Sequence, residues 1–162
     1  MLKAMILAAV LCAPQAGPAP TPAGEEPVDP YAQSNANAGV APFAGDDMLN
    51  AFHGREGIGR IVDETVDLSV ADPRMKEIFA GHDLVRLRRT VKEQLCYILN
   101  GGCDYTGRDM ATTHRDMGLQ NVDFNRFVEH LQTAMDHEGV RYRDQNRLLA
   151  KLAPMQRVTV ER

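Results

Sequence analysis

The chain has 162 residues, of which 44% are hydrophobic, and this suits one domain built around a single core. Its formal net charge of −4 leaves no basic stripe that would displace counterions from phosphates, which argues against a nucleic-acid partner. The sequence contains no strand followed by a glycine-rich phosphate loop, no His-Glu-x-x-His motif and no internal repeat. The usual enzyme signatures are therefore absent.

Residues 1–16 predict a signal peptide, because Lys3 precedes an apolar run that is too short to span a bilayer permanently. We therefore expect an exported, periplasmic protein without a stable membrane span; without a functional signal, the protein stays in the cytoplasm. Loss of Cys12 with the signal leaves Cys96 and Cys103. These form a disulfide in an oxidising compartment or remain two thiols in the cytoplasm, and spacing alone does not decide between the two.

Residues 17–45 are rich in Pro, Ala, Gly, Asn and Ser and almost lack periodic apolar residues. Seven of the nine prolines precede Gly45. This composition predicts a disordered tether. The composition changes at Asp46, so we expect the folded domain to cover residues 46–160.

The folded part shows four main helical patterns and no period-2 run long enough for a sheet, which predicts an all-α domain. Apolar residues recur at helical spacing over residues 58–66, 84–98, 122–135 and 148–155. Asp72-Pro73 ends the first pattern, because proline disfavours helix in the residue before it. Asp83 is the expected cap of the second.

A shorter helix is expected between the second and third patterns. Thr106 is its expected cap, and Gly118 is the residue at which it stops. Met110, His114 and Met117 then lie on one face. Considered alone, a histidine on an apolar helical face is more often a hydrogen-bonded core residue than a metal ligand.

A series of short motifs runs in order over residues 47–158. The motifs are Gly57-Ile58, Ile61-Val62-Asp63, Ala71-Asp72-Pro73, Phe79-Ala80-Gly81, Asp83-Leu84, Arg86-Leu87, Gly101-Gly102, Tyr105-Thr106-Gly107, Met110 with His114, Gly118-Leu119 and Leu152-Ala153-Pro154. Their order and spacing resemble the truncated haemoglobins, in particular the group 1 branch of that family. The resemblance implies a truncated globin, a two-over-two helical sandwich around a haem pocket that holds one haem b per chain.

For His114, the resemblance implies the role of proximal iron ligand. A neutral imidazole can bind haem iron through one nitrogen while the other donates to a carbonyl that fixes the tautomer. Phe79 matches the aromatic residue that packs flat against the porphyrin. The other pocket positions implied are Leu87, Val91, Met110, Leu119, Phe124, Phe127, Leu149 and Leu152, each of which also suits an ordinary helical core. Arg86, Arg88, Arg115 and Tyr105 are the candidates for binding the propionates.

The sequence departs from the family on the distal side, where a gas would bind. The usual aromatic pair aligns with Thr65 and Val66, so the tyrosine that donates to bound oxygen is absent. Leu87 and Val91 make the facing wall apolar, and the candidate replacement donors are Thr65, Thr90 and Gln94. Losing one such hydrogen bond is worth roughly 1.5 kcal/mol, or about tenfold in affinity, so we expect weaker oxygen retention than in a tyrosine-bearing relative.

The remaining histidines are not expected to bind iron, with one open case. His82 precedes the distal helix and is either a second iron ligand or a propionate or surface residue. His53, His130 and His137 are expected to be exposed or to lie in turns.

At the level of function, the resemblance implies reversible binding of oxygen or another diatomic gas, as in oxygen transport. Haem-dependent oxidation of nitric oxide or peroxide chemistry, with an unidentified reductase, is one alternative. A haem-free or haem-sensing module that keeps the globin fold for partner binding is the other.

Overall fold

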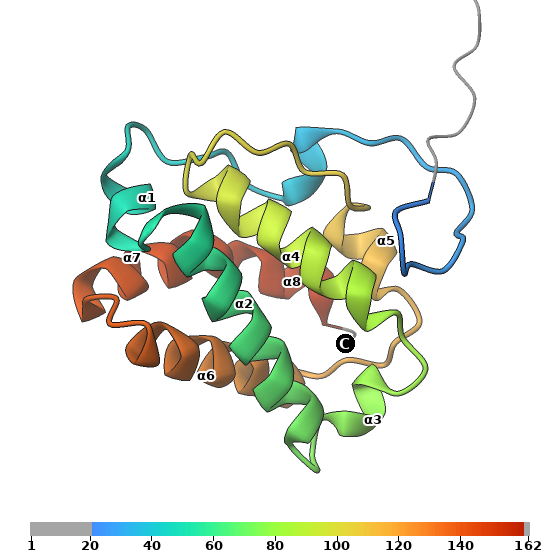
Figure 1. Cartoon of the computed structure of the whole chain (residues 1–162). Coiled ribbons are helices and arrows are strands. Elements are labelled where there is room, and N and C mark those ends of the chain that lie inside the picture. The colour runs from blue at the N-terminus through green and yellow to red at the C-terminus, as the bar shows by residue number, and fades with distance from the viewer. Residues whose placement is uncertain (1–20, 161–162) are drawn as a thin grey trace, which may run out of the picture.

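The computed structural model describes residues 21–160, and within that range every regular element is a helix (Figure 1). The predicted signal peptide at residues 1–16 lies outside the described residues. In chain order the elements are η1 (Asn35–Ala38), α1 (Asp47–Ala51), α2 (Gly54–Ala71), α3 (Lys76–Phe79), α4 (Leu84–Ile98), α5 (Met110–His114), α6 (Asn121–His137), α7 (Tyr142–Leu152), η2 (Ala153–Met155) and α8 (Gln156–Thr159). Among these helices, none combines the length and apolarity that a bilayer span requires.

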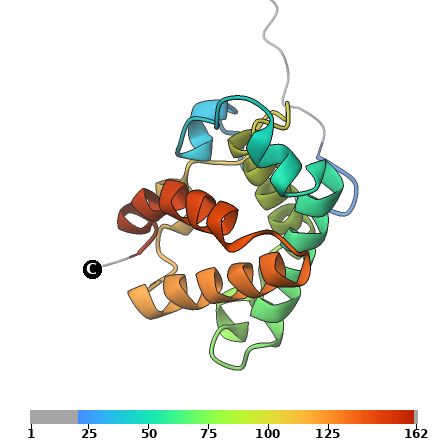
Figure 2. The ribbon, with the colours of Figure 1, turned by 90° about the vertical axis from the view of Figure 1, so that its left-hand side faces the viewer.

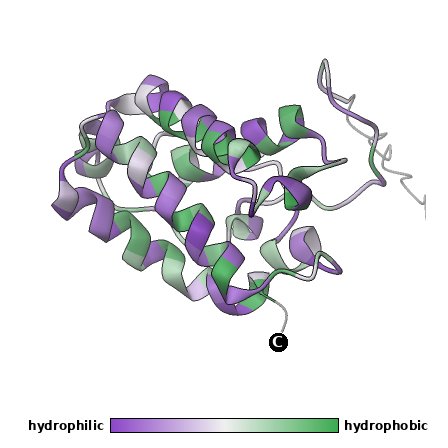
Figure 3. Ribbon diagram, turned by 90° about the horizontal axis from the view of Figure 1, so that it is seen from below, coloured by the Kyte–Doolittle hydropathy of each residue, from purple (hydrophilic) through white to green (hydrophobic). Residues whose placement is uncertain are grey.

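The long helices form two layers, which confirms the all-α prediction. Helices α2 and α4 make one layer and α6 and α7 the other, with α2 packed against both α4 and α6 (Figures 1 and 2). Each long helix has hydrophobic and hydrophilic positions along its length, as Figure 3 shows, and the hydrophobic ones meet in one core. The largest fully buried side chains include Phe52, Met48, Ile61, Ile98 and Leu148.

The ends of α2 and α4 follow their sequence signals. Asp72 is the C-cap of α2 and precedes Pro73, as predicted. The carboxylate of Asp83 accepts a hydrogen bond from the backbone N–H of Arg86 at 2.9 Å and so caps α4. These two short-range signals were sufficient because both act within one helical turn.

The cap predicted for α5 was wrong. Asp109, not Thr106, precedes this helix, and its carboxylate accepts from the backbone N–H of Thr112 at 2.9 Å. Thr106 instead donates from its hydroxyl to Glu93 on α4 at 2.7 Å. The contact with another helix removes Thr106 from capping, so α5 is shorter than expected and Met117 lies beyond its end.

Cys96 and Cys103 form a disulfide, with their Cα atoms 5.7 Å apart. Cys96 lies in the last turn of α4, and Cys103 lies in the loop that leads to α5. The structure therefore decides between the two alternatives that spacing left open. The bridge ties the long helix α4 to the segment that precedes His114.

The described part of residues 17–45 is folded against the domain, which corrects the disordered tether expected from composition. Ala38 is fully buried, and its carbonyl accepts a hydrogen bond from the amide of Gln94 at 3.0 Å. The backbone N–H of Phe43 donates to the carbonyl of Ile98 at 2.8 Å. Composition missed these contacts because they join residues more than fifty positions apart and need no apolar periodicity.

His130 is buried, which corrects the expectation that it is exposed. Its side chain is only 8% exposed, and its Nδ1 lies 3.0 Å from the hydroxyl of Ser69. Its Nε2 lies 3.4 Å from the carboxylate of Asp72. Burial lowers the pKa of His130 below its ordinary value. His130 therefore joins α6 to the end of α2. His53 and His137 are exposed, as expected.

Candidate functional site

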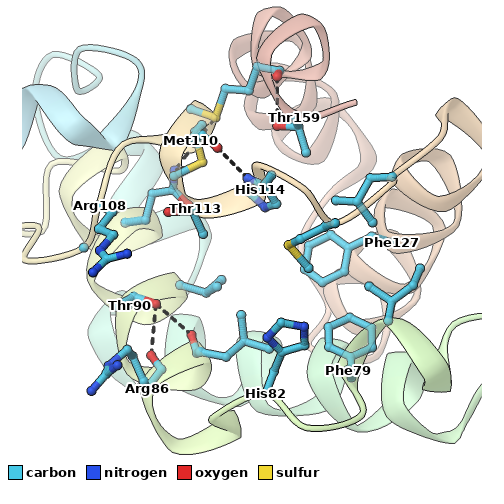
Figure 4. A pocket seen from close by; sticks show the side chains of 18 of the residues that line it. Phe79, His82, Arg86, Thr90, Arg108, Met110, Thr113, His114, Phe127 and Thr159 are labelled. Carbon is cyan, nitrogen blue, oxygen red and sulfur yellow. Dashed lines mark hydrogen bonds between the residues drawn. The ribbon is translucent and has the colours of Figure 1, made fainter. Parts of the chain in front are cut away.

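A cavity of about 470 Å³ lies between the two helical layers, within the size range of small-molecule and cofactor sites (Figure 4). All eight residues predicted for the cofactor site line it: Phe79, Leu87, Val91, Met110, His114, Leu119, Phe124 and Phe127. Leu152 lines it as well, whereas Leu149 packs against the core outside this lining. Residues from α3, α4, α5 and α6 thus line one cavity.

His114 ends α5 and turns its imidazole into the cavity (Figure 4). Its Nδ1 lies 2.7 Å from the carbonyl oxygen of Met110, one helical turn earlier. Because a carbonyl oxygen can only accept, Nδ1 carries the proton and Nε2 keeps its lone pair. Burial lowers the pKa of His114 below its ordinary value, so the ring is neutral at neutral pH.

The walls around His114 are apolar and partly aromatic. Phe79 comes from α3, and Phe124 and Phe127 come from α6. Leu87 and Val91 face the cavity from α4. A flat, apolar ring system with one metal ion matches this combination of aromatic walls and a single neutral imidazole.

The polar residues predicted to replace the missing tyrosine are already engaged with backbone carbonyls. Thr65 donates its hydroxyl to Ile61 at 2.7 Å, and Thr90 donates to Arg86 at 2.9 Å. The amide of Gln94 donates to the carbonyl of Ala38. These bonds strengthen the prediction of an apolar distal wall.

Val66 does not take the distal position expected for it. Thr65 and Val62 are the α2 residues found in the described lining of the cavity, whereas Val66 is fully buried in the core. A large side chain at position 66 would have to displace core residues rather than enter an open space. Leu87 and Val91 are therefore the residues that control the polarity of this wall.

The mouth of the cavity contains part of the predicted cationic set. Arg86 lines the cavity, and His82 lies exposed at its edge (Figure 4). Arg88 points elsewhere, with its guanidinium 2.8 Å from the Asp63 carbonyl, and Arg115 is exposed outside the lining. Tyr105 lines the cavity and donates to the carbonyl of Arg108 at 2.9 Å.

Burial raises the pKa of the Tyr105 phenol to about 12, so its hydroxyl keeps its proton in alkaline solution as well as at neutral pH. Several lining residues were not predicted from the sequence, and Val28, Tyr31 and Arg108 are three of them. Val28 and Tyr31 belong to the segment expected to be disordered. Their sequence signal was one valine and one tyrosine in a stretch dominated by proline, small and polar residues, which is too weak to place them.

The residues of the cavity fit a haem. One neutral imidazole presents a free Nε2, which is the donor that haem iron takes in globins. Aromatic and aliphatic side chains supply apolar faces for the macrocycle, and Arg86 supplies a cation at the mouth. Globin folds pack helices around such a pocket.

Comparison with known proteins agrees with this geometry. The bacterial-like globin family matches residues 48–161. Group 1 truncated hemoglobin GlbN from Nostoc sp. (strain MUN 8820) is 32% identical over 108 residues, covering 67% of this chain and 92% of its own length. The corresponding protein from Nostoc commune is 31% identical over 93 residues, covering 57% and 79%.

Solved structures support the same fold. The Fe(III) form of truncated hemoglobin from Tetrahymena pyriformis matches with a TM-score of 0.68 at 22% identity, covering 71% of this chain and 98% of its own. The 2/2 hemoglobin of Synechococcus sp. PCC 7002, in the cyanomet state with covalently attached heme, matches with a TM-score of 0.66 at 19% identity and the same coverage.

The two helical layers and the histidine that faces the cavity between them define a haem globin. The chain belongs to the bacterial-like globin family, and its relatives place it with the group 1 truncated haemoglobins.

Proposed function

We propose that the protein holds one haem b through Nε2 of His114 and binds oxygen or another diatomic gas reversibly on the opposite side of the cavity. The observation that carries the proposal is the orientation of His114. The N–H at Nδ1 donates to the Met110 carbonyl, with 2.7 Å between nitrogen and oxygen, and the unprotonated Nε2 is left to bind a metal. Bound haem supplies an iron with an open coordination position for a diatomic ligand.

The other residues of the chain orient the cofactor and exclude water. Phe79, Phe124 and Phe127 give the macrocycle apolar walls, and Leu87 and Val91 keep the gas side free of donors. An oxygen carrier also needs an external reductant that keeps the iron ferrous, and we include such an unidentified reductase in the proposal.

An optical spectrum of the purified full chain tests this proposal. We expect a Soret band after haem addition, and a shift of that band when the reduced protein is exposed to carbon monoxide. A chain that gives no Soret band with excess haem would refute haem binding. A Soret band that carbon monoxide does not shift would refute an open gas site.

The lining of α4 leads to a prediction about oxygen retention. Leu87→Gln places an amide donor on the apolar wall and should slow oxygen dissociation by about tenfold, the effect of one added hydrogen bond. Leu87→Met is the matched control, because it keeps an apolar side chain of similar size. Stopped-flow oxygen dissociation measures both variants, and equal rates for the two would contradict the prediction.

We also propose that the protein is exported, and the disulfide supports this proposal. The Cys96–Cys103 bridge is typical of an oxidising compartment. N-terminal sequencing of the native protein tests this, since removal of residues 1–16 is expected and a retained Met1 would count against it.

A further inference from the structure

Residues 25–31, which we call the strap, cross the mouth of the cavity. Val28 and Tyr31 belong to its lining, although both precede the first helix of the globin domain. Pro27 and Pro30 lie within the strap and have no backbone N–H that needs a partner. The strap has no regular secondary structure, and Val28 and Tyr31 are the two of its residues that line the pocket.

One end of the strap is held by the carboxylate of Glu25. Its side chain is only 1% exposed, and it lies between two arginines of α4. Arg86 donates from Nε at 3.0 Å, and Arg89 donates from Nε and, at 2.9 Å, from Nη2. A carboxylate this buried requires such partners, because an unpaired charge would be costly away from water. The two guanidinium groups hold the pKa of Glu25 below its usual value.

Backbone groups reinforce the same end. The backbone N–H of Glu26 donates to the carboxylate of Asp83 at 2.8 Å, and Arg86 donates to the carbonyl of Glu26. Asp83 is also the cap of α4. The strap is therefore fastened to the first turn of the helix that carries Leu87 and Val91.

The other end of the strap is fastened to the loop before α5. The hydroxyl of Tyr31 donates to the carbonyl of Thr106 at 2.8 Å, and Arg108 donates to the carbonyl of Asp29 at 3.1 Å. The guanidinium of Arg108 also lies over the Tyr31 ring, 4.9 Å from its centroid. The strap thus joins α4 to the segment that leads to His114.

We propose that the strap is a latch over the haem pocket, and that Glu25 is the positioning residue that keeps it closed through Arg86 and Arg89. A closed latch slows both the entry and the loss of haem. This inference rests on the proposed haem-binding function. The ion pair with Glu25 also gives Arg86, a candidate partner for a haem propionate, a carboxylate partner within the chain.

The first test measures haem loss from the ferric protein to excess apomyoglobin. Glu25→Gln removes the charge while keeping the shape, and we expect haem dissociation to become about tenfold faster, as for one lost charged hydrogen bond. Glu26→Gln is the matched control, because Glu26 takes part through its backbone N–H and carbonyl. Equal haem dissociation from Glu25→Gln and the wild type would overturn the proposal.

A second test needs no haem and separates failure of the latch from failure of the proposed function. Entry of the amphipathic dye anilinonaphthalene sulfonate, whose aromatic body fluoresces in apolar surroundings, into the apoprotein is followed by stopped-flow fluorescence. We expect faster entry in Glu25→Gln and in Tyr31→Phe, which loses the bond to Thr106 at the other end. Near-ultraviolet circular dichroism checks that each variant is folded. Dye entry at the wild-type rate in the folded variants would overturn the latch, whether or not the chain binds haem.

Discussion

His114→Ala is expected to abolish axial coordination of haem iron and to weaken haem binding by on the order of 100-fold or more. Removing a residue that only hydrogen-bonds a metal ligand lowers metal affinity by up to about 100-fold. The loss should be at least as large here, because the ligand itself is removed. His114 presents its unprotonated nitrogen to the cavity because the Met110 carbonyl holds the other one. Haem titration followed by the Soret band measures the change.

Two controls separate loss of the ligand from loss of the fold. His82→Ala removes the other imidazole at the cavity and is expected to leave the Soret spectrum unchanged. His114→Gly opens space for a free imidazole, so added imidazole should restore a coordinated spectrum. A His114→Ala protein with the wild-type spectrum would contradict the assignment of His114 as the iron ligand.

Removal of the Cys96–Cys103 disulfide is expected to lower the free energy of unfolding by about 2.5 kcal/mol, from the chain entropy of closing a loop of this size. The two cysteines are seven positions apart, and the bridge joins α4 to the loop before α5. Urea unfolding of the oxidised and the reduced wild-type protein measures the difference without any change of sequence.

The double variant Cys96→Ala with Cys103→Ala is the control for this measurement. It should unfold near the midpoint of the reduced wild type, apart from the small effect of truncating the buried Cys96. Reductant should not change its midpoint. An oxidised wild type that unfolds at the same urea concentration as the reduced protein would show that the bridge does not stabilise the fold.

The helices of this protein were largely predictable because their signals are local. Apolar residues at helical spacing placed α2, α4, α6 and α7, and Asp72-Pro73 and Asp83 marked two of their ends correctly. Thr106 shows the limit of such reasoning. A threonine can cap a helix, but the carboxylate of Glu93 on another helix binds its hydroxyl instead. A local pattern cannot anticipate that competition.

The pocket was predictable to a similar extent. The ordered motifs of the globin domain identified His114 and the apolar residues now seen around one cavity. They placed Val66 on the distal wall, yet its side chain lies in the core and Thr65 faces the cavity from α2. Adjacent helix residues point about 100° apart, so an aligned position does not by itself decide which side chain faces the pocket.

The sequence by itself determined the helical class, the globin family and the histidine that faces the pocket. Apolar periodicity and the order of motifs are properties of the linear sequence and need no knowledge of long-range contacts. Only the tertiary structure decided the pairing of Cys96 with Cys103, the burial of His130 and the folding of the strap over the mouth. Each of these depends on groups that come together from distant positions. The contact between Glu25 and Arg89 shows the reason, because a carboxylate in a proline-rich segment predicts nothing until the chain brings two arginines around it.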